Sequence, residues 1–369
     1  MKSIVILLVS GLSSIIIADA IDNSRYLKLE LVQVLFRHGA RTPNNVEINT
    51  NNYTLAEMYA PLGLGQLTNK GKQQEYEFGR FLRKRYDDYL GTSYKSKDVY
   101  TYSSTSARTQ MSLQLVLAGL YPPSDSEIWN PRLKWSPIPY EQVPFESDVL
   151  LESYKTSTFR KHMTRALDSD QFKRRLAKFS DFFKFVEERT IIKNIDSFWT
   201  THSTFDILIA NEFMNMPLPD WYTPEVREKF LEAGEILRDA MIATPKMKRI
   251  GVGPLAKAFT ENMNHERMIV NPKKLYLYSA HEANISMFVK ALNINELKYI
   301  HFGSALIFEQ LRDLEDKVYV RLLFWNGAGN LSALKLSNKE FCPIGDYLKI
   351  VDSIIPSDTE INEMLRIMK

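Results

Sequence analysis

The pattern of apolar and polar positions predicts alternating strands and helices at both ends of the chain. Residues 27–36 form an almost unbroken apolar run with β-branched members, as in a buried strand, which stops at Arg37-His38-Gly39. Residues 71–89 repeat their apolar side chains at helical spacing, with charged side chains elsewhere. Shorter strands, each followed by a helix, are expected at 99–103 with 111–120, and at 274–279 with 283–292.

The middle of the chain lacks strand patterns. Between residues 151 and 245 the apolar positions recur at helical spacing. Asp168 or Ser169 is expected to cap a helix that runs to about Arg189, and Thr223 followed by Pro224 is a second helix start. After this block, residues 305–309 and 318–325 predict two strands of a hairpin.

Strand–helix alternation interrupted by a helical block predicts an α/β fold with a core sheet flanked by helices and a smaller helical cap insertion. The core is expected to comprise residues 21–150 and 246–369, and the cap residues 151–245. The strand near Val318 could offer a sheet edge for a homodimer.

Residues 1–20 predict a secretory signal peptide. Lys2 is followed by an apolar run from Ile4 to Ile17 and by Ala18-Asp19-Ala20, a small-residue cleavage site. No later stretch approaches the roughly 18 apolar residues of a membrane-spanning helix. The protein is therefore expected to be secreted and extracellular, without a membrane span.

Composition narrows the classes of partner. The net charge is +3, with lysines and arginines scattered along the chain, so nucleic acid is not an expected ligand.

Cys342 is the single cysteine, which leaves a buried inert thiol or an intermolecular bridge as alternatives. Glycosylation sequons occur at Asn52, Asn284 and Asn330; we expect glycans at Asn52 and Asn330 and none at Asn284, which lies near the candidate site.

Arg37, His38 and Arg41 follow the first predicted strand. Ligands of open α/β sheets bind beyond the carboxyl ends of strands. Two guanidinium groups can hold a tetrahedral oxyanion through paired hydrogen bonds, and an imidazole between them can attack phosphorus. A solvated Arg-His turn is the alternative interpretation of these three residues alone.

Four stretches, in the same order, resemble the histidine acid phosphatase family over nearly all of the chain after residue 20. They are FRHGARTP at residues 36–43, GQLTNKGKQQ at 65–74, RTQMS at 108–112 and YSAHE at 278–282.

The resemblance implies a role for each matching residue. His38 corresponds to the nucleophile that forms a phosphohistidine, and Glu282 stands at the position of the catalytic proton donor. Arg37, Arg41 and Arg108 correspond to phosphate-binding residues, to which His281 adds a further hydrogen bond. No cofactor or metal is implied, and the sequence shows no metal-ligand cluster.

Two departures from the family pattern concern turnover. The family's proton donor is aspartate, whereas Glu282 carries one more methylene, which moves the carboxyl group by about 1 Å, and such a misplacement can cost on the order of a hundredfold in rate. Upstream of Arg108, Tyr102 replaces an arginine, and Thr105 and Ala107 stand where carboxylates are common, so Arg108 is expected to lack a partner that fixes its rotamer.

Two functions follow. The first is a secreted small-ligand binder or scavenger with weak or no phosphatase activity, whose ligand is a phosphomonoester, another anion, or a small amine or lipid. The alternative is an active acid phosphatase that hydrolyses phosphomonoesters through a phosphohistidine at His38. Turnover of a generic phosphomonoester distinguishes them.

Overall fold

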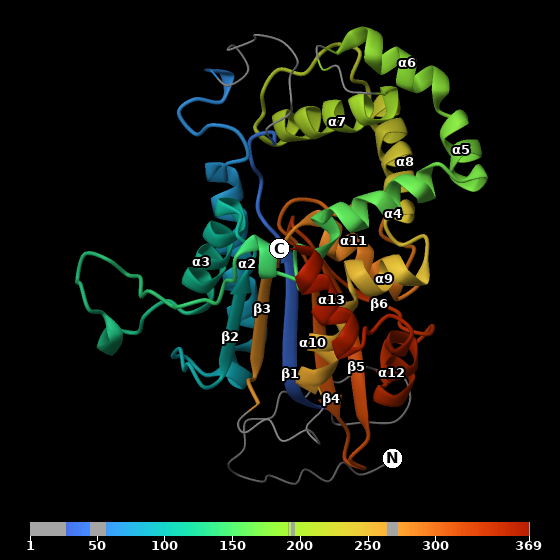
Figure 1. Ribbon diagram of the computed structural model, residues 1–369. Helices are drawn as coiled ribbons and strands as arrows, with labels where there is room; N and C mark the ends of the chain where they lie inside the picture. The colour runs from blue at the N-terminus through green and yellow to red at the C-terminus, as the bar shows by residue number, and fades with distance from the viewer. Residues whose placement is uncertain (1–26, 45–56, 191, 193–195, 264–271, 369) are drawn as a thin grey trace, which may run out of the picture.

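The computed structural model describes residues 27–44, 57–190, 192, 196–263 and 272–368. A mixed sheet runs through the molecule, with strand order β2-β3-β1-β4-β5-β6 and with β7 paired to β5 (Figure 1). The strands are β1 (Lys28–Arg37), β2 (Val99–Ser103), β3 (Leu275–Ala280), β4 (Ser304–Arg312), β5 (Val318–Asn326), β6 (Leu331–Leu334) and β7 (Phe341–Pro343). The fold is therefore α/β, as the sequence predicts.

Helices cover the sheet and form the middle of the chain. They are α2 (Asn69–Leu90), α3 (Ala107–Leu120), α4 (Ser157–Leu167), α5 (Asp170–Ala177), α6 (Ser180–Arg189), α7 (Ser197–Phe213), α8 (Pro224–Ala240), α9 (Pro245–Gly251), α10 (Gly253–Met263), α11 (Glu282–Ala291), α12 (Ile344–Asp352) and α13 (Asp358–Met368). Three short 3-10 helices, η1 (Asp125–Glu127), η2 (Phe145–Ser147) and η3 (Ser153–Lys155), lie between α3 and α4.

Strand β1 lies at the centre of the sheet. It pairs in parallel with β3, and β3 pairs in parallel with β2, so these three strands end at the same edge. Arg37 is opposite Ala280 in this register, which places His38 and His281 next to each other just beyond the strands. The parallel register thus brings two sequence motifs together at one edge.

Alternate side chains of β1 face two different cores. Val32, Val34 and Phe36 pack against α2 and α3, whereas Leu31 and Leu35 pack on the side of α9 to α12. All five are at most 1% exposed. Burial on both faces explains why residues 31–36 are apolar on successive positions, with Gln33 the one exception, instead of alternating.

Helices α4 to α8 lie over the carboxyl ends of the parallel strands (Figure 1). Their core is aromatic, with Phe182, Phe205 and Phe230 packed together, and it extends to Phe302 and Ala40 beside β1. The side chain of Thr223 caps α8, with Pro224 in its first turn, as the sequence predicts.

Two sequence predictions need correction. The helix expected from Asp168 or Ser169 to Arg189 is divided at Lys178 and Phe179 into α5 and α6, and the two helices pack differently. Phe172 of α5 packs against Ile236 and Ala240 of α8, whereas the phenylalanines of α6 join the aromatic core. The hairpin of β4 and β5 is confirmed, but β5 offers no free edge, since it pairs with β4 on one side and with β6 and β7 on the other. Homodimerisation stays a prediction.

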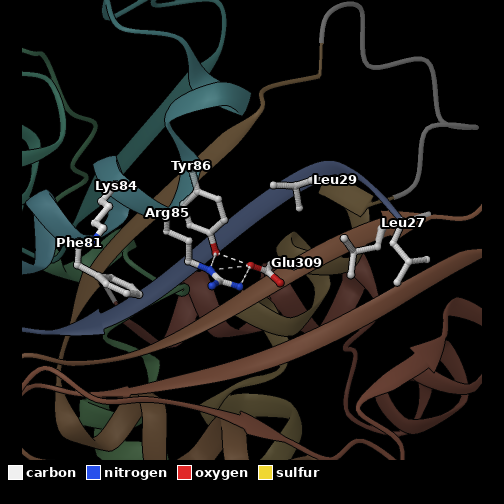
Figure 2. A pocket seen from close by; sticks show the side chains of 8 residues that line it. Leu27, Leu29, Phe81, Lys84, Arg85, Tyr86 and Glu309 are labelled. Atoms are coloured by element: carbon white, nitrogen blue, oxygen red, sulfur yellow. Dashed lines mark hydrogen bonds and ion pairs between the residues drawn. The ribbon is translucent and has the colours of Figure 1, made fainter. Parts of the chain in front are cut away.

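A partly open cavity of about 370 Å³ lies at the other end of β1 from His38 (Figure 2). Leucines and Phe81 line it, and at its base Glu309 accepts hydrogen bonds from Arg85 and from the hydroxyl of Tyr86 (2.7 Å each). Glu309 is 1% exposed, so this buried ion pair joins α2 to β4.

The single cysteine lies inside the molecule. Cys342 on β7 is a free thiol with no exposed surface, which excludes the intermolecular bridge.

The two described sequon asparagines differ in exposure. Asn284 is buried and donates to the carbonyl of Leu151 (3.0 Å), whereas Asn330 is exposed. Residues 1–20 and Asn52 lie outside the described residues. Within the described residues, no helix is both long and apolar enough to cross a membrane.

Candidate active site

The loop after β1 is held by the first turns of α2. Gly39 and Gly71 cross so closely that a Cβ on Gly39 would lie 2.4 Å from the carbonyl oxygen of Gly71. Thr68 caps α2 and also binds the carbonyl of Ala40 through its backbone and side chain, both at 2.9 Å. The amide of Ala40 donates to Gln74 (3.0 Å). The stretch 65–74 is therefore the support of the loop that carries His38.

His38 is oriented with one ring nitrogen free. Its Nδ1 lies 2.9 Å from the carbonyl oxygen of Gly39, and because a carbonyl only accepts, Nδ1 carries the proton and Nε2 keeps its lone pair. Burial, together with the charges of Arg108, Arg37 and Arg41, lowers the pKa of His38 well below its ordinary value. The imidazole thus stays neutral and nucleophilic in mildly acidic solution.

The side chains of Arg37 and Arg41 converge on the aromatic ring of Phe302. The guanidinium of Arg37 lies 4.0 Å from the ring centroid, and that of Arg41 lies 5.6 Å from it. Arg37 also donates to the carbonyl of Ile300, and the His38 ring is 5.8 Å from Phe302. Phe302, which sequence reasoning did not identify, is therefore the shared platform of the two arginines.

Asp206 on α7 holds Arg41. Nη2 of Arg41 donates to Oδ1 at 2.6 Å and Nη1 donates to Oδ2 at 3.3 Å, while the backbone amide of Asn44 also donates to Oδ2 at 3.0 Å. Burial alone would raise the pKa of Asp206, but the charge and hydrogen bonds of Arg41 lower it to about 2. The carboxylate is therefore ionised in neutral and mildly acidic solution.

Asp206→Ala should weaken the binding of inorganic phosphate about tenfold or more, because a charge-assisted hydrogen bond of this kind contributes about 1.5–3 kcal/mol. Asp206→Asn, which keeps one acceptor for the guanidinium, should lose less. Isothermal titration calorimetry measures both affinities. Tighter phosphate binding by the alanine variant would mean that Asp206 only competes with the anion.

Arg108 stands at the start of α3, where it is partly buried close to Arg41. Its Nε makes no hydrogen bond to any described residue. Tyr102, which replaces a family arginine, is turned away and donates to Asp148 (2.9 Å). Burial and the charge of Arg41 lower the pKa of Arg108 to about 10, so it is still cationic at neutral and acidic pH. That Arg108 lacks a partner that fixes its rotamer stays a prediction.

His281 follows β3 and caps α11. Its ring is 5.6 Å from that of His38 in an edge-on arrangement. Nε2 lies 3.0 Å from the hydroxyl of Ser104 and 3.5 Å from a carboxylate oxygen of Glu152. Burial lowers the pKa of His281 to about 3, and the hydrogen bond to Glu152 opposes this effect. The two histidines, 243 positions apart in the sequence, thus share one centre.

Glu282 is the first residue of α11, and its side chain folds back along the helix. Oε1 accepts from the hydroxyl of Ser286 at 2.7 Å and lies 3.9 Å from Nη1 of Arg238. The carboxyl group therefore has hydrogen-bond and charge partners of its own, which no sequence pattern indicated.

Glu75 on α2 is a buried acid that sequence reasoning missed. It has no exposed surface, and neither carboxyl oxygen has a hydrogen-bond partner in the described part of the chain. A Cβ on Gly303 would lie 3.6 Å from Oε1, and the amide of Gly303 donates to the carbonyl of His38 (3.1 Å). Burial raises the pKa of Glu75 well above its ordinary value.

Glu75→Gln should raise the melting temperature at pH 7.5 and leave it nearly unchanged at pH 4. Above the unfolded-state pKa of about 4.3 the unfolded chain releases the Glu75 proton while the folded protein keeps it, so stability falls as the pH rises toward the folded-state pKa. A neutral amide removes that loss. Thermal unfolding at the two pH values measures the difference, and an equal shift at both would contradict the explanation.

The centre contains three guanidinium groups, a neutral imidazole with a free Nε2 and a second imidazole. Such an arrangement can bind a tetrahedral dianion and form a bond from nitrogen to its central atom. The structure brings together Arg37, His38, Arg41, Arg108 and His281, with Glu282 one residue beyond. Among the described residues, no group of three or more His, Cys, Asp and Glu side chains could hold a metal ion.

Comparison with known proteins gives a consistent result. Residues 28–325 match the family model of the histidine phosphatase superfamily, branch 2. The chain is 34% identical over 342 residues to venom acid phosphatase Acph-1 of Apis mellifera, covering 90% of this chain and 87% of that protein. It is 30% identical over 338 residues to human prostatic acid phosphatase, with 90% and 86% covered.

Solved structures show the same fold at low sequence identity. A Hafnia alvei phytase in complex with tartrate superposes with a TM-score of 0.66 at 16% identity, covering 89% of this chain and 98% of the phytase. A Klebsiella phytase gives a TM-score of 0.65, also at 16% identity, with 90% and 98% covered.

Proposed function

The chain belongs to branch 2 of the histidine phosphatase superfamily, and on that premise we propose that it is an acid phosphatase that hydrolyses phosphomonoesters through a phosphohistidine at His38. One observation carries this proposal. The Nδ1 proton of His38 is bound to Gly39, which leaves Nε2 unprotonated among three arginines.

In the first step, Nε2 of His38 attacks the phosphorus atom, and the bond from phosphorus to the ester oxygen breaks. Arg37, Arg41 and Arg108 balance the charge that develops on the other three oxygens of the phosphoryl group. Glu282 in its acid form gives its proton to the leaving oxygen, so that the alcohol departs neutral.

In the second step, water attacks the phosphohistidine. The Glu282 carboxylate accepts a proton from that water, the nitrogen–phosphorus bond breaks, and inorganic phosphate leaves. His38 returns to its neutral state with Nε2 free. Each turn therefore consumes one phosphomonoester and one water and regenerates both residues.

A ligand binder with little turnover is the second candidate, and one observation favours it. The carboxyl group of Glu282 is bound to Ser286 on its own helix, so the phosphate cradle is complete while the proton donor is engaged elsewhere. Such a protein would retain a phosphomonoester or another anion, or a small amine or lipid, without cleaving it.

Turnover of p-nitrophenyl phosphate by the purified protein at pH 5 tests the proposal. We expect a kcat of about 1 s⁻¹ or more, within the usual range of enzymes. Alkaline quenching during turnover should trap the acid-labile phosphohistidine. Binding of phosphate without measurable turnover would reject the enzyme in favour of the binder.

Secretion and glycosylation complete the proposal. The pattern of residues 1–20 and the exposed sequon at Asn330 support a secreted glycoprotein. Mass spectrometry of the protein from culture medium tests both, since the mature amino terminus should lie near Ile21 and Asn330 should carry a glycan.

A further inference from the structure

Glu152 is a buried carboxylate that neither the family motifs nor the mechanism above use. It follows η2 and lies behind His281, with its side chain 1% exposed. One oxygen lies 3.5 Å from Nε2 of His281, and the other lies 2.5 Å from Nζ of Lys155. The neighbouring carbonyl of Leu151 accepts from Asn284 of α11, which ties this segment to the helix that His281 caps.

The hydrogen-bond network around His281 determines which nitrogen carries its proton. The hydroxyl of Thr109 has a single hydrogen, which it gives to the carbonyl of Ser106 (2.7 Å) or of Ser104 (3.1 Å). With the Thr109 hydrogen on a carbonyl, the hydroxyl of Ser104 donates to Thr109, 2.9 Å away, and accepts from Nε2–H of His281 at 3.0 Å. This arrangement favours a proton on Nε2 of His281.

Glu152 reinforces this assignment. A carboxylate near Nε2 stabilises a proton there, and in the ionised form it has no proton to give. Burial opposes ionisation of Glu152, but the interaction with His281 at 3.5 Å and the charge of Lys155 hold its pKa below the ordinary value. The carboxylate also opposes the positive charges of Lys155 and Arg108, both of which disfavour a protonated His281.

We propose that Glu152 is a positioning residue of the phosphatase reaction, which fixes the orientation and the Nε2–H tautomer of His281 from the buried side of the site. This inference rests on the proposed function for its kinetic consequence. Its structural content, the tautomer of His281, does not depend on turnover.

The Glu152→Gln variant distinguishes a residue that positions His281 from one that contributes only a negative charge to the site. A negative charge near a phosphate site repels the substrate, so if Glu152 acted only as a charge, Glu152→Gln would lower KM and leave kcat unchanged. If it positions His281, the same variant should lower kcat about tenfold to a hundredfold, the usual cost of losing a residue that orients a functional histidine.

Asp148→Asn is the matched control. Asp148 is a second buried carboxyl of the same segment, but it binds Tyr102 and the amide of Leu151 instead of His281. Its asparagine variant removes a titratable acid from the same place in the fold, and we expect it to change kcat less than threefold. Thermal unfolding of both variants monitors the integrity of the segment.

Nitrogen-15 NMR of the imidazole rings provides the readout that needs no turnover, with the His281 signal assigned from a His281→Gln variant. We expect the Nε2–H tautomer in the unsubstituted protein and in Asp148→Asn, and a mixture of tautomers in Glu152→Gln. An unchanged tautomer and an unchanged kcat in Glu152→Gln would overturn the inference. A tautomer change in a protein that never hydrolyses phosphomonoesters would instead refute the proposed function and leave the positioning of His281 intact.

Discussion

His38→Ala should lower kcat for p-nitrophenyl phosphate by on the order of 10⁵- to 10⁶-fold, the scale on which removal of a covalent nucleophile acts. The ring has no substitute in the centre. The imidazole beside it among the described residues, His281, has its Nε2 directed to Ser104 and Glu152. No phosphohistidine should be trapped in the variant.

The cradle should survive this substitution. Arg37 is held by Ile300 and Phe302, and Arg41 by Asp206, none of which needs the imidazole. Inorganic phosphate should therefore still bind to His38→Ala. His162→Ala on α4 is the histidine control and should keep full activity. Turnover within tenfold of the unsubstituted protein would show that another group attacks phosphorus.

Glu282→Asp should raise kcat, by up to about a hundredfold, if the length of the side chain limits turnover. Glutamate is long enough to fold back to the hydroxyl of Ser286, one turn along α11. Aspartate, one methylene shorter, reaches less far along the helix, so its carboxyl group stays near the amino terminus of α11 beside His281.

Ser286→Ala provides the matching control for Glu282. It removes the hydroxyl that holds the carboxyl group and leaves the glutamate in place, so a smaller rise in kcat is expected. Glu282→Gln, which cannot donate a proton as an acid, should lower kcat about 10²- to 10⁴-fold, the usual contribution of general acid catalysis. A fall in kcat for Glu282→Asp would show that Glu282 is already correctly placed.

The parts of the site that depend on local sequence could be predicted. The apolar run of β1 ends at Arg37, and β3 ends just before His281, so the ends of two parallel strands determine the position of both histidines. The same holds for Arg108 at the start of α3, after β2. Family motifs added the roles, because they match these strand ends residue by residue.

The parts that depend on tertiary packing could not be predicted. Asp206 lies 165 positions after Arg41, inside a helix that mixes apolar and polar residues, and only the packing of α7 over the sheet brings the two together. Phe302 is an ordinary core aromatic in the sequence. Glu75 and Glu152 look like solvent-facing acids, because burial of a carboxyl group leaves no signal in a single sequence.

The division between α5 and α6 has the same origin. No glycine or proline marks the break at Lys178 and Phe179, and helical spacing continues through it. The turn lets α5 and α6 pack into two different apolar clusters. The position of the break therefore follows from packing against α8, and the residues at the break give no signal of it.

The sealed thiol of Cys342 has a practical consequence. Since it is the single sulfhydryl of the chain and lies entirely within the interior, no covalent cross-link supports the architecture. The stability of the fold therefore does not depend on the formation of a disulfide bond within the chain. Folding of the chain requires no oxidative step, and a reducing medium removes no bond that the fold uses.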